Sequence, residues 1–256
     1  MVEQLELDGD VVVTVDRLAT VLHQVDLDGD PRRLAYELQR DGWLGRLRTR
    51  HAWEFLPGAR GGAYSSGDRF IEFRAQRAVD PTWGGVLAME SAASVLGFAQ
   101  RIPEQEVVAL PDNERFPKAL AGDWRYVRIE LQSSAIATVN GLPSWTLEGL
   151  LVGIAARPSA YKDVAGLGQW LAEAAPGVDT ANVVELLQPM GNATRQRAAY
   201  LLAASDSEHA AAAIVEAYPP SEIAWLGPRE AGGFFDSNTK VNDTLLFNYL
   251  SIGTGS

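Results

Sequence analysis

Arginine side chains are concentrated in one short stretch of this 256-residue chain. Residues 31–60 hold seven arginines and three acidic residues, whereas residues 1–30 hold one arginine and eight acidic residues. The net charge of the whole chain is −11, but net charge governs solubility and steering, while direct contacts depend on local charge. Because a guanidinium group binds phosphate and guanine bidentately, residues 31–60 are a candidate nucleic-acid contact.

A helix is expected to carry the first of these arginines, through the segment RRLAYELQRD. Asp30 is the predicted N-cap, Pro31 suits the first helical position, and Gly42 is the predicted terminator. Leu34 and Leu38 form an apolar stripe at helical spacing. Five side chains are left facing outward: Arg32, Arg33, Tyr36, Gln39 and Arg40.

A hairpin is expected to carry the next arginines. Side chains alternate between the faces of a strand, so Arg46, Arg48 and Arg50 are predicted to share one face while Leu47 points the other way. Residues 51–56 are predicted to be the returning strand, and Pro-Gly follows as a turn signal.

The elements before this region complete a recognisable order. Residues 11–13 predict a strand, Thr14 a helix N-cap, and residues 15–24 a helix with its apolar residues on one side. Strand, helix, turn, helix and basic hairpin are the order of a winged helix-turn-helix, whose second helix enters the major groove. The predicted DNA contacts are Arg32, Arg33, Tyr36, Gln39, Arg40, Arg46, Arg48 and Arg50. The alternative is a solvated basic face on a small helical domain.

The rest of the chain predicts a different kind of domain. We expect an α+β protein with a winged helix-turn-helix at 1–60, a connector at 61–80 and a larger mixed α/β domain at 81–256. Helices are predicted at 86–99, 146–158, 164–174, 180–188, 193–204 and 207–217, strands at 106–110 and 126–131, and extended or buried segments at 222–226 and 243–250.

The larger domain does not look like a second DNA-binding surface. Residues 79–256 hold 11 basic and 20 acidic residues, so this domain should face away from DNA. Arg195 and Arg197 could extend a basic surface, although a solvated helix face is the favoured interpretation. Only a cluster in space with Arg125 and Arg128 would change that expectation.

Several kinds of chemistry are disfavoured, and we predict no catalytic residue, metal or cofactor. The chain has no cysteine, and His23, His51 and His209 lack zinc-site spacing. Asp26, Asp28, Asp30 and Glu37 match part of a calcium loop, but Pro31 replaces its turn glycine. Nucleotide-binding glycine loops and nucleophile elbows are missing. The acidic start and the lack of a long apolar run predict a cytoplasmic protein without a membrane span.

The chain also resembles a known family, the AbiEi-type antitoxins of bacterial type IV toxin–antitoxin systems, and most closely their mycobacterial members. The segments that carry the resemblance are VVVTVDRL, LAYELQRDGWLGRLRTRHAWEFLPG, MESAASVLGFAQRIP, LEGLLVGIAARPSAY and ATRQRAAYLLAA, in this order. The resemblance implies a winged helix-turn-helix before an antitoxin domain. It also implies repression of the protein's own operon through promoter repeats, and a partner gene for a nucleotidyltransferase-like toxin.

One departure concerns the first helix, for which only the short acidic segment MVEQLELDG is available. We therefore predict a non-catalytic autorepressor and antitoxin that binds double-stranded promoter DNA, with a direct toxin complex left open. The first alternative is a protein-interaction module whose acidic carboxy-terminal domain binds a basic partner. The second is an enzyme of unlisted type, which the size of the larger domain would permit.

Overall fold

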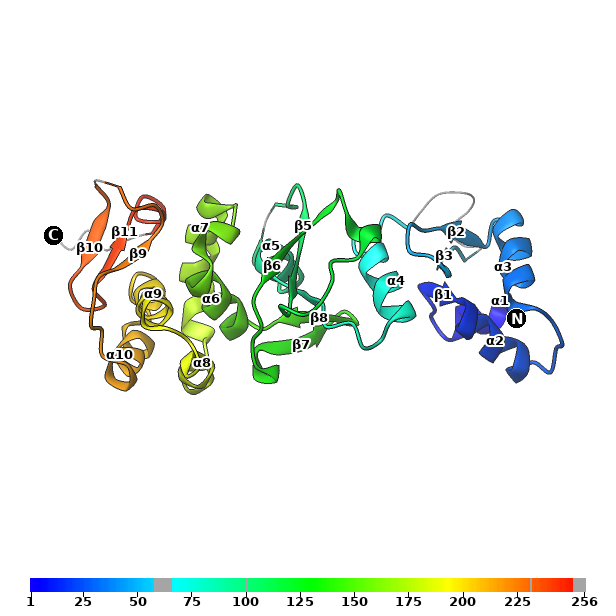
Figure 1. The fold of residues 1–256 in the computed structure, drawn as a ribbon, viewed down its shortest axis with the longest axis horizontal. Helices are drawn as coiled ribbons and strands as arrows, with labels where there is room; N and C mark the ends of the chain where they lie inside the picture. Colours follow the sequence, from blue (N-terminus) through cyan, green and yellow to red (C-terminus); the bar gives the residue numbers. More distant parts are fainter. Residues whose placement is uncertain (58–65, 100, 231, 251–256) are drawn as a thin grey trace. The chain divides into compact units, whose positions relative to one another are not determined.

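The structure is a computed structural model that describes residues 1–57, 66–99, 101–230 and 232–250. Its contacts divide the chain into two compact units (Figure 1). The amino-terminal unit contains residues 1–84 together with 115–121, and the carboxy-terminal unit contains the rest. Both units combine helices with sheets, so the predicted α+β class is confirmed.

The amino-terminal unit has the element order that the arginine-rich region predicted. Its elements are α1 (Val2–Leu7), β1 (Val12–Thr14), α2 (Val15–Gln24), α3 (Pro31–Arg40), β2 (Leu44–Arg46), β3 (Ala52–Phe55), α4 (Ile71–Val79) and the short helix η2 (Lys118–Leu120). The three strands form an antiparallel sheet in the order β1-β3-β2. This arrangement is compatible with a winged helix-turn-helix, in which α2 and α3 are the two central helices.

Local sequence signals set the ends of these helices. The Thr14 hydroxyl accepts a hydrogen bond from the Arg17 amide at 3.1 Å, and the Asp30 carboxylate accepts one from the Arg32 amide at 3.0 Å. Both predicted N-caps are therefore confirmed. Gly42 has a φ of +84°, a left-handed conformation that glycine adopts without strain.

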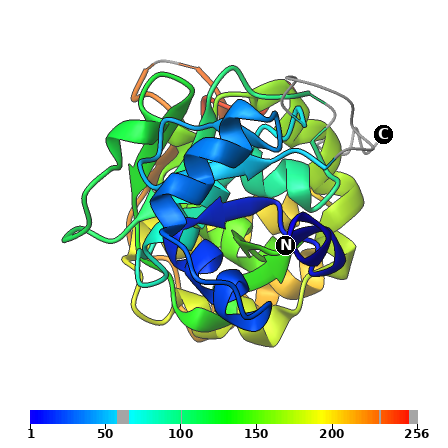
Figure 2. The ribbon, with the colours of Figure 1, turned by 90° about the vertical axis from the view of Figure 1, so that its right-hand side faces the viewer.

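A small core holds this unit together and includes the first helix. Its fully covered side chains come from α1, the sheet, α2 and α3: Leu5, Val13, Leu18, Val21, Ala35, Leu38, Leu44 and Phe55. Figure 2 looks onto this unit, with the dark-blue helix α1 beside the start of the chain. The acidic first segment is thus a helix of six residues that is fixed by Leu5.

The segment predicted as a connector at 61–80 contains α4, which packs against β1 and β3. Phe73 of α4 is fully buried and meets Trp83 edge-on, with ring centroids 5.3 Å apart. The Gly-, Ser- and Arg-rich composition of the segment concealed a nine-residue helix that is anchored by the buried Phe73 and Ala75. Part of the predicted connector, residues 61–65, lies outside the described residues, and the domain boundaries stay a prediction.

The carboxy-terminal unit begins with a five-stranded sheet in the order β6-β5-β4-β8-β7. Its strands are β4 (Val86–Leu87), β5 (Glu106–Leu110), β6 (Trp124–Arg128), β7 (Ile136–Val139) and β8 (Leu142–Trp145). Helix α5 (Met89–Val95) follows β4 directly, and η3 (Ser133–Ala135) precedes β7. A helix predicted from residue 86 is therefore wrong at its start, because Val86 and Leu87 pair with β5 and Leu87 also pairs with β8.

A helical layer and a second sheet complete this unit. Its elements are α6 (Leu147–Ala156), η4 (Pro158–Ala160), α7 (Val164–Ala174), η5 (Ala175–Gly177), α8 (Thr180–Leu187), α9 (Asn192–Ala203), α10 (Glu208–Ala217), β9 (Ala224–Leu226), β10 (Phe234–Asp236) and β11 (Val241–Asp243). The sheet order is β10-β11-β9. The helices predicted after residue 146 are confirmed, whereas the extended segment predicted at 243–250 is a strand only at its first residue.

A buried polar pair links α9 to this second sheet. The Tyr200 hydroxyl donates a hydrogen bond of 2.9 Å to Asp243, which also accepts from the amides of Leu245 and Leu246. Burial raises the pKa of the Asp243 carboxyl above its ordinary value of 3.8, although these hydrogen bonds oppose the change. Burial and the neighbouring Asp243 also raise the pKa of Tyr200.

The raised pKa of Asp243 predicts a pH-dependent effect of Asp243→Asn. The folded carboxyl keeps its proton to a higher pH than the unfolded one, so its contribution to stability falls as pH rises above about 4. We expect the stability of wild type relative to Asp243→Asn to decrease from pH 4 to pH 7. Urea unfolding of both proteins at several pH values measures this difference, and a difference that grows with pH would contradict the assignment.

Candidate nucleic-acid interface

Helix α3 presents one continuous polar face to solvent. The five side chains predicted to face outward are all exposed: Arg32, Arg33, Tyr36, Gln39 and Arg40. At 3.6 residues per turn they fall within an arc of about 120°. Ala35 and Leu38 are buried on the other side. Tyr36 is 68% exposed although its ring is apolar, so this face carries an aromatic group among cations.

Two of the arginines on this face are paired with acids of the same region. The Arg33 Nε atom lies 3.1 Å from Glu37, and the Arg40 Nε atom lies 3.0 Å from Asp41. The hydrogen bond to Asp41 raises the pKa of Arg40. Exposed pairs of this kind are weak, so both guanidinium groups can exchange their partner for a stronger anion. Among the described residues, Arg32 has no acidic partner.

Two of the three hairpin arginines lie in the turn rather than along a strand. Strand β2 ends at Arg46 and β3 begins at Ala52, so Arg48 and Arg50 belong to the turn between them. The prediction that Arg46, Arg48 and Arg50 share one strand face is therefore wrong, because strand alternation stops where pairing stops. All three are nevertheless exposed. His51, also exposed, closes the turn with a φ of +64°.

A buried carboxylate from α4 holds this turn in place. Glu72 is 8% exposed and accepts hydrogen bonds from the Arg48 amide at 2.6 Å, the Thr49 amide at 3.1 Å and the Thr49 hydroxyl at 2.9 Å. The Arg48 guanidinium lies 3.7 Å from the same carboxylate and donates to the Ala121 carbonyl at 3.1 Å. Sequence reasoning missed Glu72, since nothing local distinguishes it from other acidic residues on helices.

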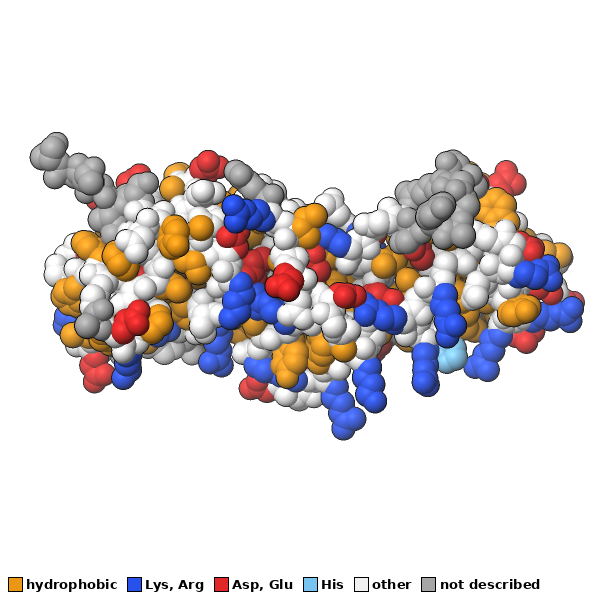
Figure 3. Space-filling model, turned by 90° about the horizontal axis from the view of Figure 1, so that it is seen from above, with side chains coloured by type: hydrophobic (Ala, Val, Ile, Leu, Met, Phe, Trp, Pro, Cys, Tyr) orange, Lys and Arg blue, Asp and Glu red, His pale blue; other side chains and the backbone are white. Residues whose placement is uncertain are grey.

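A hydrogen bond joins the helix face to the hairpin. The Trp53 indole donates to the Gln39 side-chain oxygen at 3.1 Å. Gln39, Trp53, Glu72 and residues 46–52 line one shallow hollow of about 720 Å³. Figure 3 shows Lys and Arg side chains projecting in a row from the amino-terminal unit, on the right, with a histidine between them. The predicted contact residues of the helix and the turn therefore meet on one basic surface.

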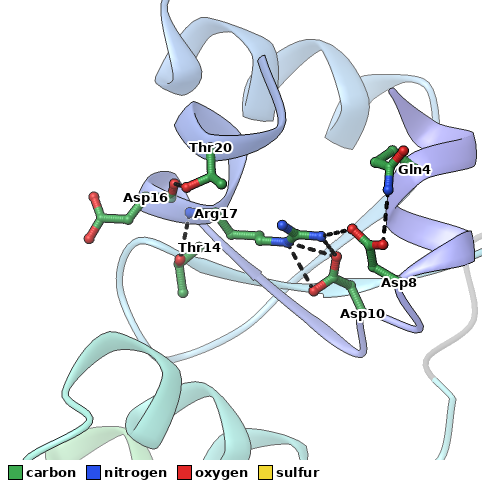
Figure 4. A network of polar contacts seen from close by, with 7 residues as sticks. All are labelled: Gln4, Asp8, Asp10, Thr14, Asp16, Arg17 and Thr20. Carbon is green, nitrogen blue, oxygen red and sulfur yellow. Dashed lines mark hydrogen bonds and ion pairs between the residues drawn. The ribbon is translucent and has the colours of Figure 1, made fainter. Parts of the chain in front are cut away.

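The acidic residues before this surface are partly neutralised within the unit (Figure 4). Arg17 of α2 donates from Nε to Asp10 at 2.9 Å and from Nη2 to Asp8, and Asp8 also accepts from Gln4. The hydrogen bond to Asp10 is the main reason why the pKa of Arg17 is raised. This network links α1 to α2. The carboxylates of Asp8 and Asp10 both pair with Arg17, the only arginine among the first 30 residues.

Two arginines of α9, Arg195 and Arg197, bind groups within the carboxy-terminal unit. Arg195 donates to the carbonyls of Leu187 and Gln188 and lies over the Tyr218 ring. Arg197 donates to the carbonyls of Trp225 and Ala155, and burial lowers its pKa. The favoured interpretation of both as a solvated helix face is therefore wrong.

The pair Arg125 and Arg128 is engaged in the same way. Arg125 binds the buried Glu90 at 2.5 Å, and Arg128 binds the carbonyls of Pro111 and Glu114. All of these partners belong to the carboxy-terminal unit. No basic cluster forms from the four arginines, each of which holds its own part of the fold.

Two of the four acidic residues that match part of a calcium loop have other roles in the structure. Asp30 caps α3, and Glu37 is paired with Arg33. In the part of the chain that the structure describes, no group of three or more His, Asp or Glu side chains could hold a metal ion. None of the described helices is long and apolar enough to cross a bilayer. The cytoplasmic location stays a prediction.

Comparison with known proteins connects this fold to a family. Residues 85–204 match the model of the AbiEi antitoxin C-terminal domain. This stretch is similar to the C-terminal domain of AbiEi antitoxins. The predicted resemblance is thereby confirmed, and the domain supports an antitoxin function in a toxin–antitoxin system.

A solved structure is similar over nearly the whole chain. The crystal structure of the RV2827C protein from Mycobacterium tuberculosis superposes with a TM-score of 0.78 at 26% sequence identity. The match covers 96% of this chain and 90% of that one. No curated protein matches the chain. Both units of this chain thus have structural counterparts in a second protein of comparable length.

Removal of the Glu72 carboxylate is predicted to release the hairpin turn. Three buried donors lose their acceptor in Glu72→Ala, which should cost about 3 kcal/mol of unfolding free energy. We expect the amide protons of Arg48 and Thr49 to exchange with solvent much faster, as measured by hydrogen exchange. Glu3→Gln, an exposed acid of α1, is the control and should change neither quantity. Unchanged exchange at Arg48 and Thr49 in Glu72→Ala would show that the turn does not depend on this carboxylate.

Proposed function

We propose that this protein is a non-catalytic antitoxin that binds double-stranded DNA through its amino-terminal unit and represses its own operon. The observation that carries the proposal is the joined basic surface, on which the polar face of α3 meets the arginine-bearing turn. Five exposed side chains of α3 and three exposed arginines of the turn contribute to it. An α-helix fits the major groove of B-DNA, and a basic hairpin beside it reaches backbone or minor groove.

Separate roles follow from where each side chain lies. Arg32 is in the first turn of α3 and has no acidic partner among the described residues, so we assign it to a base edge. Arg46 and Arg50 lie at the turn, where phosphate contacts are made. Arg48 shares its charge with Glu72 and therefore combines a phosphate contact with a structural role. Arg33 and Arg40 would exchange their weak acidic partners for phosphates.

Gln39 is restricted in what it can recognise. A free glutamine reads adenine with both its oxygen and its amide nitrogen. Here the Trp53 indole occupies the Gln39 oxygen at 3.1 Å, which leaves the amide group as the available donor. We therefore assign Gln39 to an acceptor such as a purine N7 atom, a guanine O6 atom or a phosphate oxygen. Tyr36 would contribute apolar contact to a base or sugar.

Repression would act on repeats in the protein's own promoter, and its toxin partner would be of the nucleotidyltransferase-like type. Both expectations come from the resemblance to the AbiEi-type antitoxins, and the matched antitoxin domain supports them. A direct complex with the toxin is left open. The proposal includes no enzyme activity, no cofactor and no membrane partner.

The decisive experiment measures binding of the full chain to its own upstream DNA by fluorescence anisotropy, across a salt series and against scrambled competitor. We expect tight, sequence-selective binding whose affinity falls steeply with salt, because guanidinium–phosphate contacts release counterions. Absence of selective binding at low salt would remove the DNA-binding claim. The alternative function would then be favoured, which is a protein-interaction module whose acidic carboxy-terminal unit binds a basic partner.

Two substitutions separate base contacts from phosphate contacts. Arg32→Ala should weaken operator binding by about 1–3 kcal/mol and leave scrambled DNA nearly unaffected. Arg50→Ala should weaken binding to both DNAs alike and reduce the slope of log affinity against log salt by about 1. Arg101→Ala, which removes an exposed arginine of the carboxy-terminal unit, is the control and should change neither. Equal effects of Arg32→Ala on both DNAs would contradict its assignment to a base.

Suppression of the toxin provides a separate test of the antitoxin function. Co-expression of the chain with the neighbouring toxin gene should restore growth, and a constitutive promoter should remove any contribution from repression. If growth is restored equally by Arg32→Ala under that promoter, DNA binding and toxin suppression are independent functions of the chain. Failure of the wild-type chain to restore growth would contradict the antitoxin function.

A further inference from the structure

A groove in the carboxy-terminal unit contains none of the residues proposed to contact DNA. It is formed by α9, α10 and the segment that contains β10, and has a volume of about 650 Å³. Its floor consists of small apolar side chains from the two helices: Ala203, Ala204, Ala211, Ala212 and Val215. Phe234 of β10 forms one wall and is 38% exposed. Exposed aromatic surface beside a hollow with an apolar floor is typical of an interaction site.

Carboxylates flank this apolar floor. Glu208 and Glu216 lie near the two ends of α10, and Asp236 lies at the end of β10. No lysine or arginine is among the described residues that line the groove. An occupant would therefore meet apolar contacts in the middle and negative charge around them.

The groove is held open by contacts within the unit. The buried Gln196 of α9 donates to the Thr239 carbonyl at 2.9 Å and the Glu222 carbonyl at 2.6 Å. Asp236 accepts from the amide and hydroxyl of Thr239, at 2.8 and 2.6 Å. Tyr200, on the floor side, is anchored to Asp243. Both walls are thus fixed before any partner binds, which lowers the entropy cost of binding.

The dimensions of the groove fit a helix. Glu208, Ala211, Ala212, Val215 and Glu216 follow the spacing of one helix face, so the groove runs along α10. The two glutamates are separated by about 12 Å along the helix axis at 1.5 Å per residue. A partner helix lying along α10 would place two cations about two turns apart, with its apolar residues between them. The small floor residues leave room for large partner side chains, as in other helix-in-groove complexes.

We propose that this groove binds a basic amphipathic helix of a partner protein, with Lys or Arg about eight positions apart and large apolar residues between them. Charge complementarity selects this occupant. The chain's own last residues, SIGTGS, carry no basic side chain that could pair with the three carboxylates of the groove. The inference goes beyond DNA binding and antitoxin function. It names a surface of the carboxy-terminal unit, mostly beyond the matched residues 85–204, that would contact another protein.

A peptide selection on the full-length protein tests the proposal. A phage library of random helical peptides of about 18 residues is selected on wild type and counter-selected on Ala212→Arg, which fills the groove and adds a positive charge. We expect the enriched peptides to be basic and amphipathic with the spacing stated above. Their affinity, measured by fluorescence anisotropy with synthetic peptide, should fall at least tenfold in Ala212→Arg and in Glu208→Lys/Glu216→Lys.

Glu185→Lys is the matched control, because Glu185 is an exposed acid of α8 that does not line the groove. It should keep peptide affinity within about twofold, and circular dichroism should show that all variants fold. Enrichment of acidic or uncharged peptides would overturn the proposal, as would equal losses in Glu185→Lys. A concentration-dependent dimer that Ala212→Arg abolishes would also overturn it, since a second copy would then be the occupant. Binding of upstream DNA by the same variants should be unchanged, which keeps this test independent of the DNA-binding proposal.

Discussion

The buried carboxylate of Glu72 is the constraint on which the basic surface depends. An ionised carboxylate is costly to bury unless its oxygens are hydrogen-bonded, and the donors here are the backbone and side chain of the hairpin turn. The two strands of the hairpin have only three and four residues, too few to define a turn by themselves. The position of three arginines is therefore decided by a residue more than 20 positions away in the sequence.

The same dependence explains what could be predicted from the sequence. Thr14 and Asp30 were identified as N-caps because a cap is made by residues two or three positions apart. The outward face of α3 followed from helical periodicity, which is equally local. Glu72 could not be found in this way, because its partners are contributed by a different element. The shared strand face of Arg46, Arg48 and Arg50 failed for a related reason, since alternation requires a pairing partner that the turn does not have.

The carboxy-terminal unit uses its cations in the opposite manner. Arg195 and Arg197 bind main-chain carbonyls of neighbouring elements, and Arg125 neutralises the buried Glu90. The sequence predicted Arg195 and Arg197 to be surface charges, because a helical pattern does not reveal which main-chain carbonyls of other elements lie within reach of a side chain. Three of its cations are bound within the unit, and acidic residues outnumber basic ones by 20 to 11 over residues 79–256, so the surface of this unit has an acidic excess. That surface repels phosphates and attracts basic groups, so the two units favour partners of opposite charge.

The dependence of affinity on salt distinguishes DNA binding at the basic surface from peptide binding in the groove. Binding to DNA releases the counterions that a phosphate backbone condenses, so its affinity depends on salt with a slope close to the number of phosphates contacted. A peptide in the groove beside α10 would instead gain most of its affinity from apolar contact, which salt does not screen. Its three rim carboxylates contribute only screened surface attraction. On these two proposals, DNA binding at the arginine-bearing surface would lose affinity with salt far more steeply than peptide binding in the groove, although both use opposite charges.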